Sequence, residues 1–175
     1  TPRSRRTRAA LALIDRRMYA MIEEHRGQDK GDLLTLLLQT RYDDGSAMSN
    51  KQIRDEALTV FVAGHETTAN ALAWGFYLLA THPESYAKLQ EEADRVLGGR
   101  AATVADLPNL PYSLQVFKEA MRLYPPAYTI GRTALRPVDI GGYHLKKNDI
   151  LIIGSYTIHR RPEFFGPDPD AFNPD

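Results

Sequence analysis

Residues 57–80 read ALTVFVAGHETTANALAWGFYLLA, and this largely apolar run decides the fold. Ser49 followed by Gln52 is typical of a helix start, and no proline interrupts the chain from there until Pro83. The sequence therefore predicts one helix over residues 50–81, about 48 Å long at a rise of 1.5 Å per residue. Because apolar side chains occupy nearly every face of this helix, we expect it to cross the interior of a large core.

A membrane span is the main alternative for such an apolar helix. His65, Glu66 and Asn70 interrupt the run, so no stretch reaches the roughly 18 apolar residues that a span needs. The pattern therefore favours a helix inside a protein core.

The sequence after this helix predicts more helix and then a small β region. Pro111 opens a helix over residues 112–124. Beyond it the apolar period changes to two, which indicates short strands within residues 130–154, with the IGGY of residues 140–143 as a two-residue hairpin turn. The predicted fold is mainly α with a small β region (α+β), in a single partial domain over residues 1–175.

Composition excludes several classes of function. The 175 residues are 43% hydrophobic and 25% charged, which is typical of a soluble globular protein. Lysine plus arginine and aspartate plus glutamate both number 22, so we expect no nucleic-acid partner. The chain has no cysteine, which excludes disulfides, iron–sulfur clusters and cysteine nucleophiles within it.

Polar residues in the middle of the long helix are the first candidate site. Residues 63–68, AGHETT, place one acid and two hydroxyls in an apolar setting, where burial is costly unless they are hydrogen-bonded or used. A hydrogen-bonded core cluster and a functional site both fit this pattern. A zinc peptidase motif does not, because it requires a second histidine where Ala69 stands.

Two further signals lie downstream. Glu119 and Arg122 are spaced i and i+3 on one helix face, as a surface ion pair or as a buried structural pair would be. Arg132 on a predicted strand is either an exposed strand residue or the partner of an anionic ligand.

The order of the motifs points to a family. The motif AGHETT in a long helix is followed by KEAMR, RLYPP and GRTA, then by a short hairpin, HRRP and FNPD. This order resembles the cytochrome P-450 family of haem-thiolate monooxygenases, and the resemblance covers essentially the whole chain.

The resemblance implies a haem b cofactor in the parent protein and roles for several residues here. Ala63 and Gly64 would lie against the macrocycle, while Thr67, with Glu66 as the adjacent acid, would deliver protons to iron-bound oxygen. Arg132 would pair with a haem propionate. His159 would contact the haem or stabilise a turn.

The resemblance also implies a substrate pocket and a structural pair. Glu119 and Arg122 would form the pair of the E-x-x-R motif, which in the family is completed by an arginine just past the NPD segment. The residues expected to line the substrate side of the pocket are Val60, Thr68, Pro126, Ala127 and Tyr128.

The family's iron ligand is a cysteine thiolate in a glycine-rich loop, and this chain has none. We therefore expect an internal fragment that lacks the ligand loop beyond Asp175, binds no metal itself and is inactive alone. The parent would insert one oxygen atom from O2 into a small apolar organic substrate. It would use electrons from a ferredoxin- or flavoprotein-type partner, and we expect it in the cytoplasm. The alternative is a catalytically silent helical ligand-binding or interaction protein that retains the fold.

Overall fold

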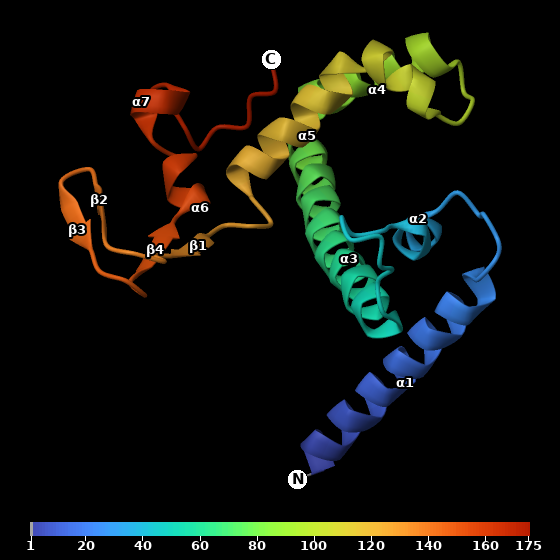
Figure 1. Ribbon diagram of the computed structural model, residues 1–175. Helices are drawn as coiled ribbons and strands as arrows, with labels where there is room; N and C mark the ends of the chain where they lie inside the picture. Colours follow the sequence, from blue (N-terminus) through green and yellow to red (C-terminus); the bar gives the residue numbers. More distant parts are fainter. Residues whose placement is uncertain (1) are drawn as a thin grey trace. The chain divides into compact units, whose positions relative to one another are not determined.

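The computed structural model describes residues 2–175 and divides into two compact units, Thr1–Glu66 and Thr67–Asp175, each of which is considered by itself. The chain is drawn in Figure 1. The first unit contains α1 (Pro2–His25), α2 (Leu33–Gln39) and the beginning of α3 (Asn50–Thr81). The single partial domain expected over residues 1–175 stays a prediction.

The start of α3 is the capping box that the sequence predicts. The backbone N–H of Ser49 donates to Gln52 Oε1 at 2.9 Å, and the Gln52 N–H donates to Ser49 Oγ at 3.3 Å. Each side chain thus satisfies an N–H group that the first turn of a helix leaves without a partner.

A small apolar cluster holds the first unit together. Ile22 of α1, Leu34 of α2 and Ile53 of α3 are buried in contact with one another. A second link is polar, since Arg54 of α3 donates from Nε to Asp15 of α1 at 2.8 Å.

Asp32 begins α2 and joins it to the end of α1. Its carboxylate accepts from the Thr35 N–H at 2.9 Å and lies 2.9 Å from His25 Nε2. The hydrogen bond from the Thr35 backbone, and next the one from His25, lower the pKa of Asp32 to about 2.

Most of the secondary structure belongs to the second unit. After the remainder of α3, its helices and strands are α4 (Pro83–Leu97), the 3₁₀ helix η1 (Val104–Asn109), α5 (Pro111–Leu123), β1 (Ile130–Thr133), β2 (Val138–Ile140), β3 (Tyr143–Leu145), β4 (Ile150–Ile153), α6 (Ser155–Ile158) and α7 (Pro162–Phe165).

The β region consists of two antiparallel pairs, β1 with β4 and β2 with β3. Ile140 pairs with Tyr143 across a turn in which Gly141 and Gly142 have φ values of 57° and 84°. Glycine adopts these left-handed conformations without strain, so the predicted two-residue hairpin is confirmed.

The core of the second unit forms where the end of α3 meets α5. Ala120 and Leu123 of α5 are almost fully buried against Leu78 and Leu79 of α3, together with Val116 and Phe172. Trp74 of α3 stacks on Tyr124 with ring centroids 3.9 Å apart. The C-terminal residues thus return to α5, the helix that carries the acid–arginine motif.

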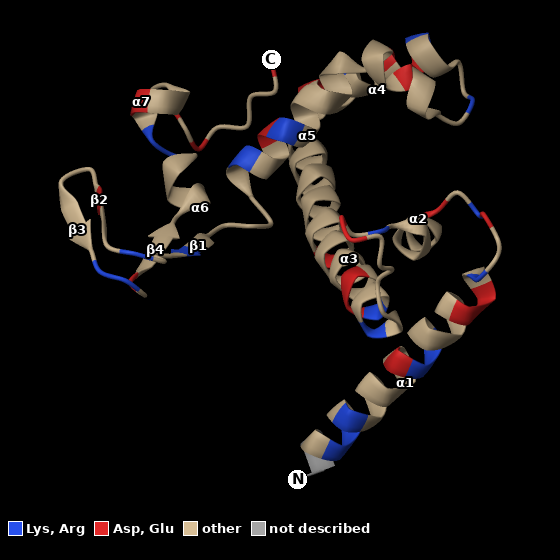
Figure 2. Cartoon of the chain, in the orientation of Figure 1, with Lys and Arg blue, Asp and Glu red and all other residues tan. Residues whose placement is uncertain are grey.

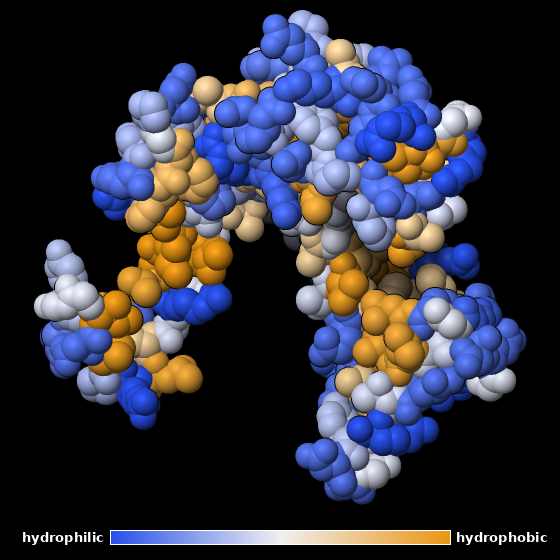
Figure 3. Space-filling view, turned by 90° about the horizontal axis from the view of Figure 1, so that it is seen from above, coloured by the Kyte–Doolittle hydropathy of each residue, from blue (hydrophilic) through white to orange (hydrophobic). Residues whose placement is uncertain are grey.

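The middle of α3 is exposed, so the expectation of a helix enclosed by a core is wrong for this chain. Every residue from 59 to 70 is exposed, including Val60 at 51% and Phe61 at 66%. Burial requires packing partners, and among the described residues these gather around Ile53 in one unit and Leu78 in the other. Hydrophobic side chains (orange) therefore stay open to solvent on the face shown in Figure 3.

Charge is unevenly spread along α1. Basic residues (blue) gather over its first turns and acidic ones (red) over its end (Figure 2). This order opposes the helix dipole, which favours acids at the N-terminus, so packing on α2 contributes to holding the helix.

Within the described residues, no helix combines the length and apolarity needed to cross a bilayer.

Candidate functional site

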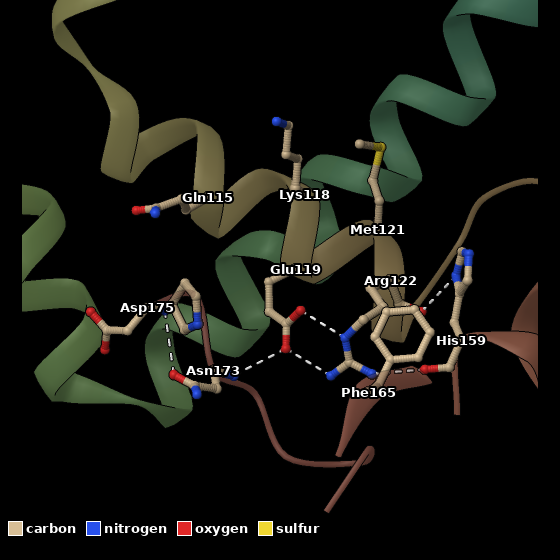
Figure 4. A pocket seen from close by; sticks show the side chains of 10 residues that line it. Gln115, Lys118, Glu119, Met121, Arg122, His159, Phe165, Asn173 and Asp175 are labelled. Carbon is tan, nitrogen blue, oxygen red and sulfur yellow. Dashed lines mark hydrogen bonds and ion pairs between the residues drawn. The ribbon is translucent and has the colours of Figure 1, made fainter. Parts of the chain in front are cut away.

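The Glu119–Arg122 pair on α5 is the best-defined polar centre of the second unit (Figure 4). Arg122 donates from Nε to Oε2 and from Nη2 to Oε1 of Glu119, both at 2.7 Å. The two side chains are only 12% and 13% exposed. Of the two interpretations left open by the spacing, these low exposures favour the buried structural pair over a surface ion pair.

Arg122 also binds the chain that follows the β region. Its Nη1 donates to the carbonyls of His159 at 2.9 Å and Pro169 at 2.5 Å, and its Nη2 donates to that of Ala171 at 2.9 Å. With the two bonds to Glu119, all five N–H donors of the guanidinium are satisfied. The side chain thus joins α5 to three points of the C-terminal segment.

Glu119 has a second donor as well. The backbone N–H of Asn173 donates to its Oε1 at 3.1 Å. A buried ion pair is stabilising when further hydrogen bonds offset its loss of hydration, and carbonyl and amide groups supply those bonds here.

His159 lies directly against this pair. Its Nδ1 is 3.2 Å from the Arg122 carbonyl, and its ring meets that of Phe165 edge-on at 5.9 Å. Phe165 in turn lies 5.1 Å from the Arg122 guanidinium, close enough for a cation–π contact. These contacts anchor α6 and α7 to α5, and a role of His159 toward a cofactor stays a prediction.

A cleft of about 540 Å³ opens beside the pair. Gln115 and Met121 line it from α5, and Asn173 and Asp175 line it from the C-terminal segment (Figure 4). One side of Glu119 and Arg122 therefore faces an open space.

Apart from His159, the residues expected at the haem and substrate lie outside this network. On α3, Val60, Ala63, Gly64 and Glu66 belong to the first unit, and Thr67 with Thr68 begins the second. All of them are exposed. Their predicted roles stay predictions.

The remaining predicted residues follow α5 in the second unit. Pro126 is half-buried, while Ala127 and Tyr128 are exposed. Arg132 lies on β1 opposite Leu151, is exposed, and donates from Nη1 to the Gly131 carbonyl at 2.8 Å. Its guanidinium has further N–H groups with which to bind an anionic ligand.

Glu92 of α4 was missed by the sequence analysis. It is 5% exposed and accepts from the backbone N–H groups of Tyr112 and Ser113, both at 2.8 Å. Burial raises the pKa of Glu92, but the bonds from Ser113 and Tyr112 outweigh it and leave the pKa below its usual value. Helical spacing cannot reveal an acid that binds the next helix some twenty residues later.

These features define a mainly α protein with a small β region and an acid–arginine pair that ties one helix to the C-terminal segment. Comparison with known proteins gives the family. The sequence matches Cytochrome P450 over residues 1–175, and the chain belongs to that family.

Relatives and solved structures agree with this assignment. Cyclooctatin synthase of Streptomyces melanosporofaciens is 41% identical over 98% of the chain, and pentalenene oxygenase of Streptomyces avermitilis is 36% identical over 100%. The crystal structure of the cytochrome P450 CYP102L1 matches 99% of the chain with a TM-score of 0.89 and 32% identity. Cyanobacterial CYP120A1 with bound retinoic acid matches 95% with a TM-score of 0.87 and 28% identity.

The chain spans about two fifths of these proteins. It covers 38% of the cyclooctatin synthase, 40% of the pentalenene oxygenase, 41% of CYP102L1 and 39% of CYP120A1.

Proposed function

We propose that this chain is part of a haem-dependent monooxygenase that inserts one oxygen atom from O2 into a small apolar organic substrate. One observation carries the proposal: the family match extends over all 175 residues, including the Glu119–Arg122 pair. The oxygenase name of one relative supports the same reaction class.

The donor atoms of this chain fit haem only in part. Arg132 is exposed with N–H groups suited to a propionate, and the acid and hydroxyls of residues 66–68 suit proton transfer. Among the described residues, no three histidines, cysteines or acids are grouped to hold a metal, and the sequence has no cysteine at all. We therefore propose that the thiolate ligand comes from outside these 175 residues.

The proposed roles follow from the chemistry of the side chains. When bound, haem supplies the iron at which dioxygen is activated. Thr67 would hold a proton at its hydroxyl. After Thr67 gives up that proton, the carboxyl of Glu66 would supply another, because a hydroxyl and a carboxyl can pass protons in sequence. Ala63 and Gly64 are small enough to let a flat ring approach the helix.

The substrate side would be largely apolar. Val60, Pro126, Ala127 and Tyr128 offer aliphatic and aromatic surface, and Thr68 adds one hydroxyl that could orient a polar group. Electrons would come from a ferredoxin- or flavoprotein-type partner.

Isotope labelling tests the proposal. The complete gene product that contains these residues would be incubated under ¹⁸O2 with an electron donor and a panel of apolar compounds that begins with pentalenene. We expect one labelled oxygen atom in the oxidised product and the second in water. An oxidised product whose oxygen comes from water, or a panel that leaves every compound unchanged, would contradict the proposal.

A further inference from the structure

The start of α5 has no capping side chain of its own. Pro111 occupies the first helical position, and Leu110 before it offers no side-chain hydrogen bond. The first N–H groups of a helix lack partners within the helix, and proline removes its own from that set. The backbone N–H groups of Tyr112 and Ser113 therefore need hydrogen-bond acceptors from outside α5.

Glu92 supplies these acceptors from a different helix, α4. Its Oε1 accepts from the Tyr112 N–H at 2.8 Å. Its Oε2 accepts from both the N–H and the hydroxyl of Ser113, also at 2.8 Å. The carboxylate is buried, and its negative charge lies at the end of α5 where the helix dipole favours an anion.

We propose that Glu92 is a positioning residue, which sets the orientation of α5 and thereby the geometry of the Glu119–Arg122 pair. The proposal deepens the proposed function, because the pair belongs to the family motif on which that function rests.

The helix is short enough to transmit such an effect. Ser113 and Glu119 are six residues apart, or about 9 Å along the helix axis. Between them Val116 is buried, as is Ala120 one residue beyond, so α5 is held along one face and at its start. A tilt at the start would displace Glu119 relative to the Asn173 N–H, which binds its Oε1 at 3.1 Å.

Amide hydrogen exchange of the 175-residue chain, read residue by residue by NMR, tests this without haem or oxygen. The variants are Glu92→Ala and Glu92→Gln, with Glu91→Ala as the matched control, since Glu91 is an exposed acid on the same helix. Glu92→Ala should accelerate exchange of the Tyr112, Ser113 and Asn173 amides by roughly tenfold or more. Glu92→Gln keeps one acceptor oxygen of two, so its rates should lie between those of the wild type and Glu92→Ala.

The Tyr143 amide of the β2–β3 hairpin distinguishes positioning from general loosening, and it should keep its wild-type rate in both variants. Acceleration at residues 112 and 113 alone, with Asn173 unchanged, would show a local cap and overturn the proposal. Equal acceleration at every amide in both variants would also overturn it. If Glu92→Ala does not fold, the Asn173 rate in Glu92→Gln decides. Because no oxygen chemistry is measured, failure here leaves the monooxygenase proposal standing.

Discussion

Arg122 joins α5 to several distant points of the second unit through polar contacts. Its guanidinium binds one carboxylate and three backbone carbonyls that lie 37 to 49 residues away in sequence. A planar, permanently charged group with five N–H donors can satisfy this arrangement, whereas the compact ammonium of lysine cannot.

Removing the acid should therefore destabilise the chain. Glu119→Ala leaves Arg122 largely buried without its counter-ion, and we expect the free energy of unfolding to fall by about 3–5 kcal/mol. Urea denaturation followed by circular dichroism measures this change. Lys118→Ala is the control, because the neighbouring exposed side chain should change the value by no more than about 0.5 kcal/mol. A loss equal to the control's would show that the pair contributes nothing.

In the proposed chemistry, proton transfer depends on the hydroxyl oxygen of Thr67. In the complete gene product, Thr67→Ala should lower product formed per electron consumed, since the hydroxyl that holds the proton is gone. Oxygen uptake, peroxide release and product are measured together. Thr81→Ala, at the far end of α3, should keep the wild-type ratio. An unchanged ratio in Thr67→Ala would remove Thr67 from the mechanism.

Among the elements, α1 and α2 are joined by one carboxylate in addition to their apolar contacts. The pKa of Asp32 is lowered to about 2, chiefly by the Thr35 N–H and then by His25. A carboxyl whose pKa is lower in the folded state stabilises that state above its ordinary pKa of about 4, and this stabilisation is lost as pH falls towards 2.

The chemical shift of the Thr35 amide proton should follow this titration. We expect a midpoint near pH 2 in the intact chain, and we expect Asp32→Ala to abolish the shift change. Asp43→Ala, which replaces an exposed acid in the following turn, should leave the midpoint unchanged. A midpoint near pH 4 would mean that the hydrogen bonds at the start of α2 do not lower the pKa of Asp32.

The elements differ in how far sequence predicts them. The long helix was expected at 50–81 and is Asn50–Thr81, because the Ser49–Gln52 box and Pro83 mark its ends locally. The turn at Gly141-Gly142 was predicted in the same way, from the two adjacent glycines that form it. By contrast, no proline or glycine after Pro2 marks where α1 begins, so its start at Pro2 is not set by a local signal of this kind.

The site was predictable only where it depends on spacing along one helix. Glu119 and Arg122 are one helical turn apart, so their pairing could be predicted from spacing. The carbonyls that complete the network belong to residues distant in sequence, and spacing along a helix does not predict such contacts. The exposure of Glu66 and Thr67 was missed for the same reason. A helix pattern reports which side chains are apolar and leaves open which segments will cover them.

For the whole molecule, the exposed apolar surface has a measurable consequence. Phe61 and Phe76 are 66% and 67% exposed, and large apolar surfaces of this kind bind hydrophobic dyes. Phe61→Ser should reduce dye fluorescence of the 175-residue chain with less than about 0.5 kcal/mol change in stability. Dye binding that is unaffected, together with a large loss of stability, would show that Phe61 is buried in solution.

We propose that these residues belong to an enzyme whose haem iron takes a thiolate ligand from outside this chain. The reduced carbon monoxide difference spectrum of the complete gene product tests it most directly, with the 175-residue chain as control. We predict the band of a thiolate-ligated haem in the complete protein and no such band in the control. A complete protein that binds no haem, or whose spectrum is that of histidine-ligated haem, would contradict it.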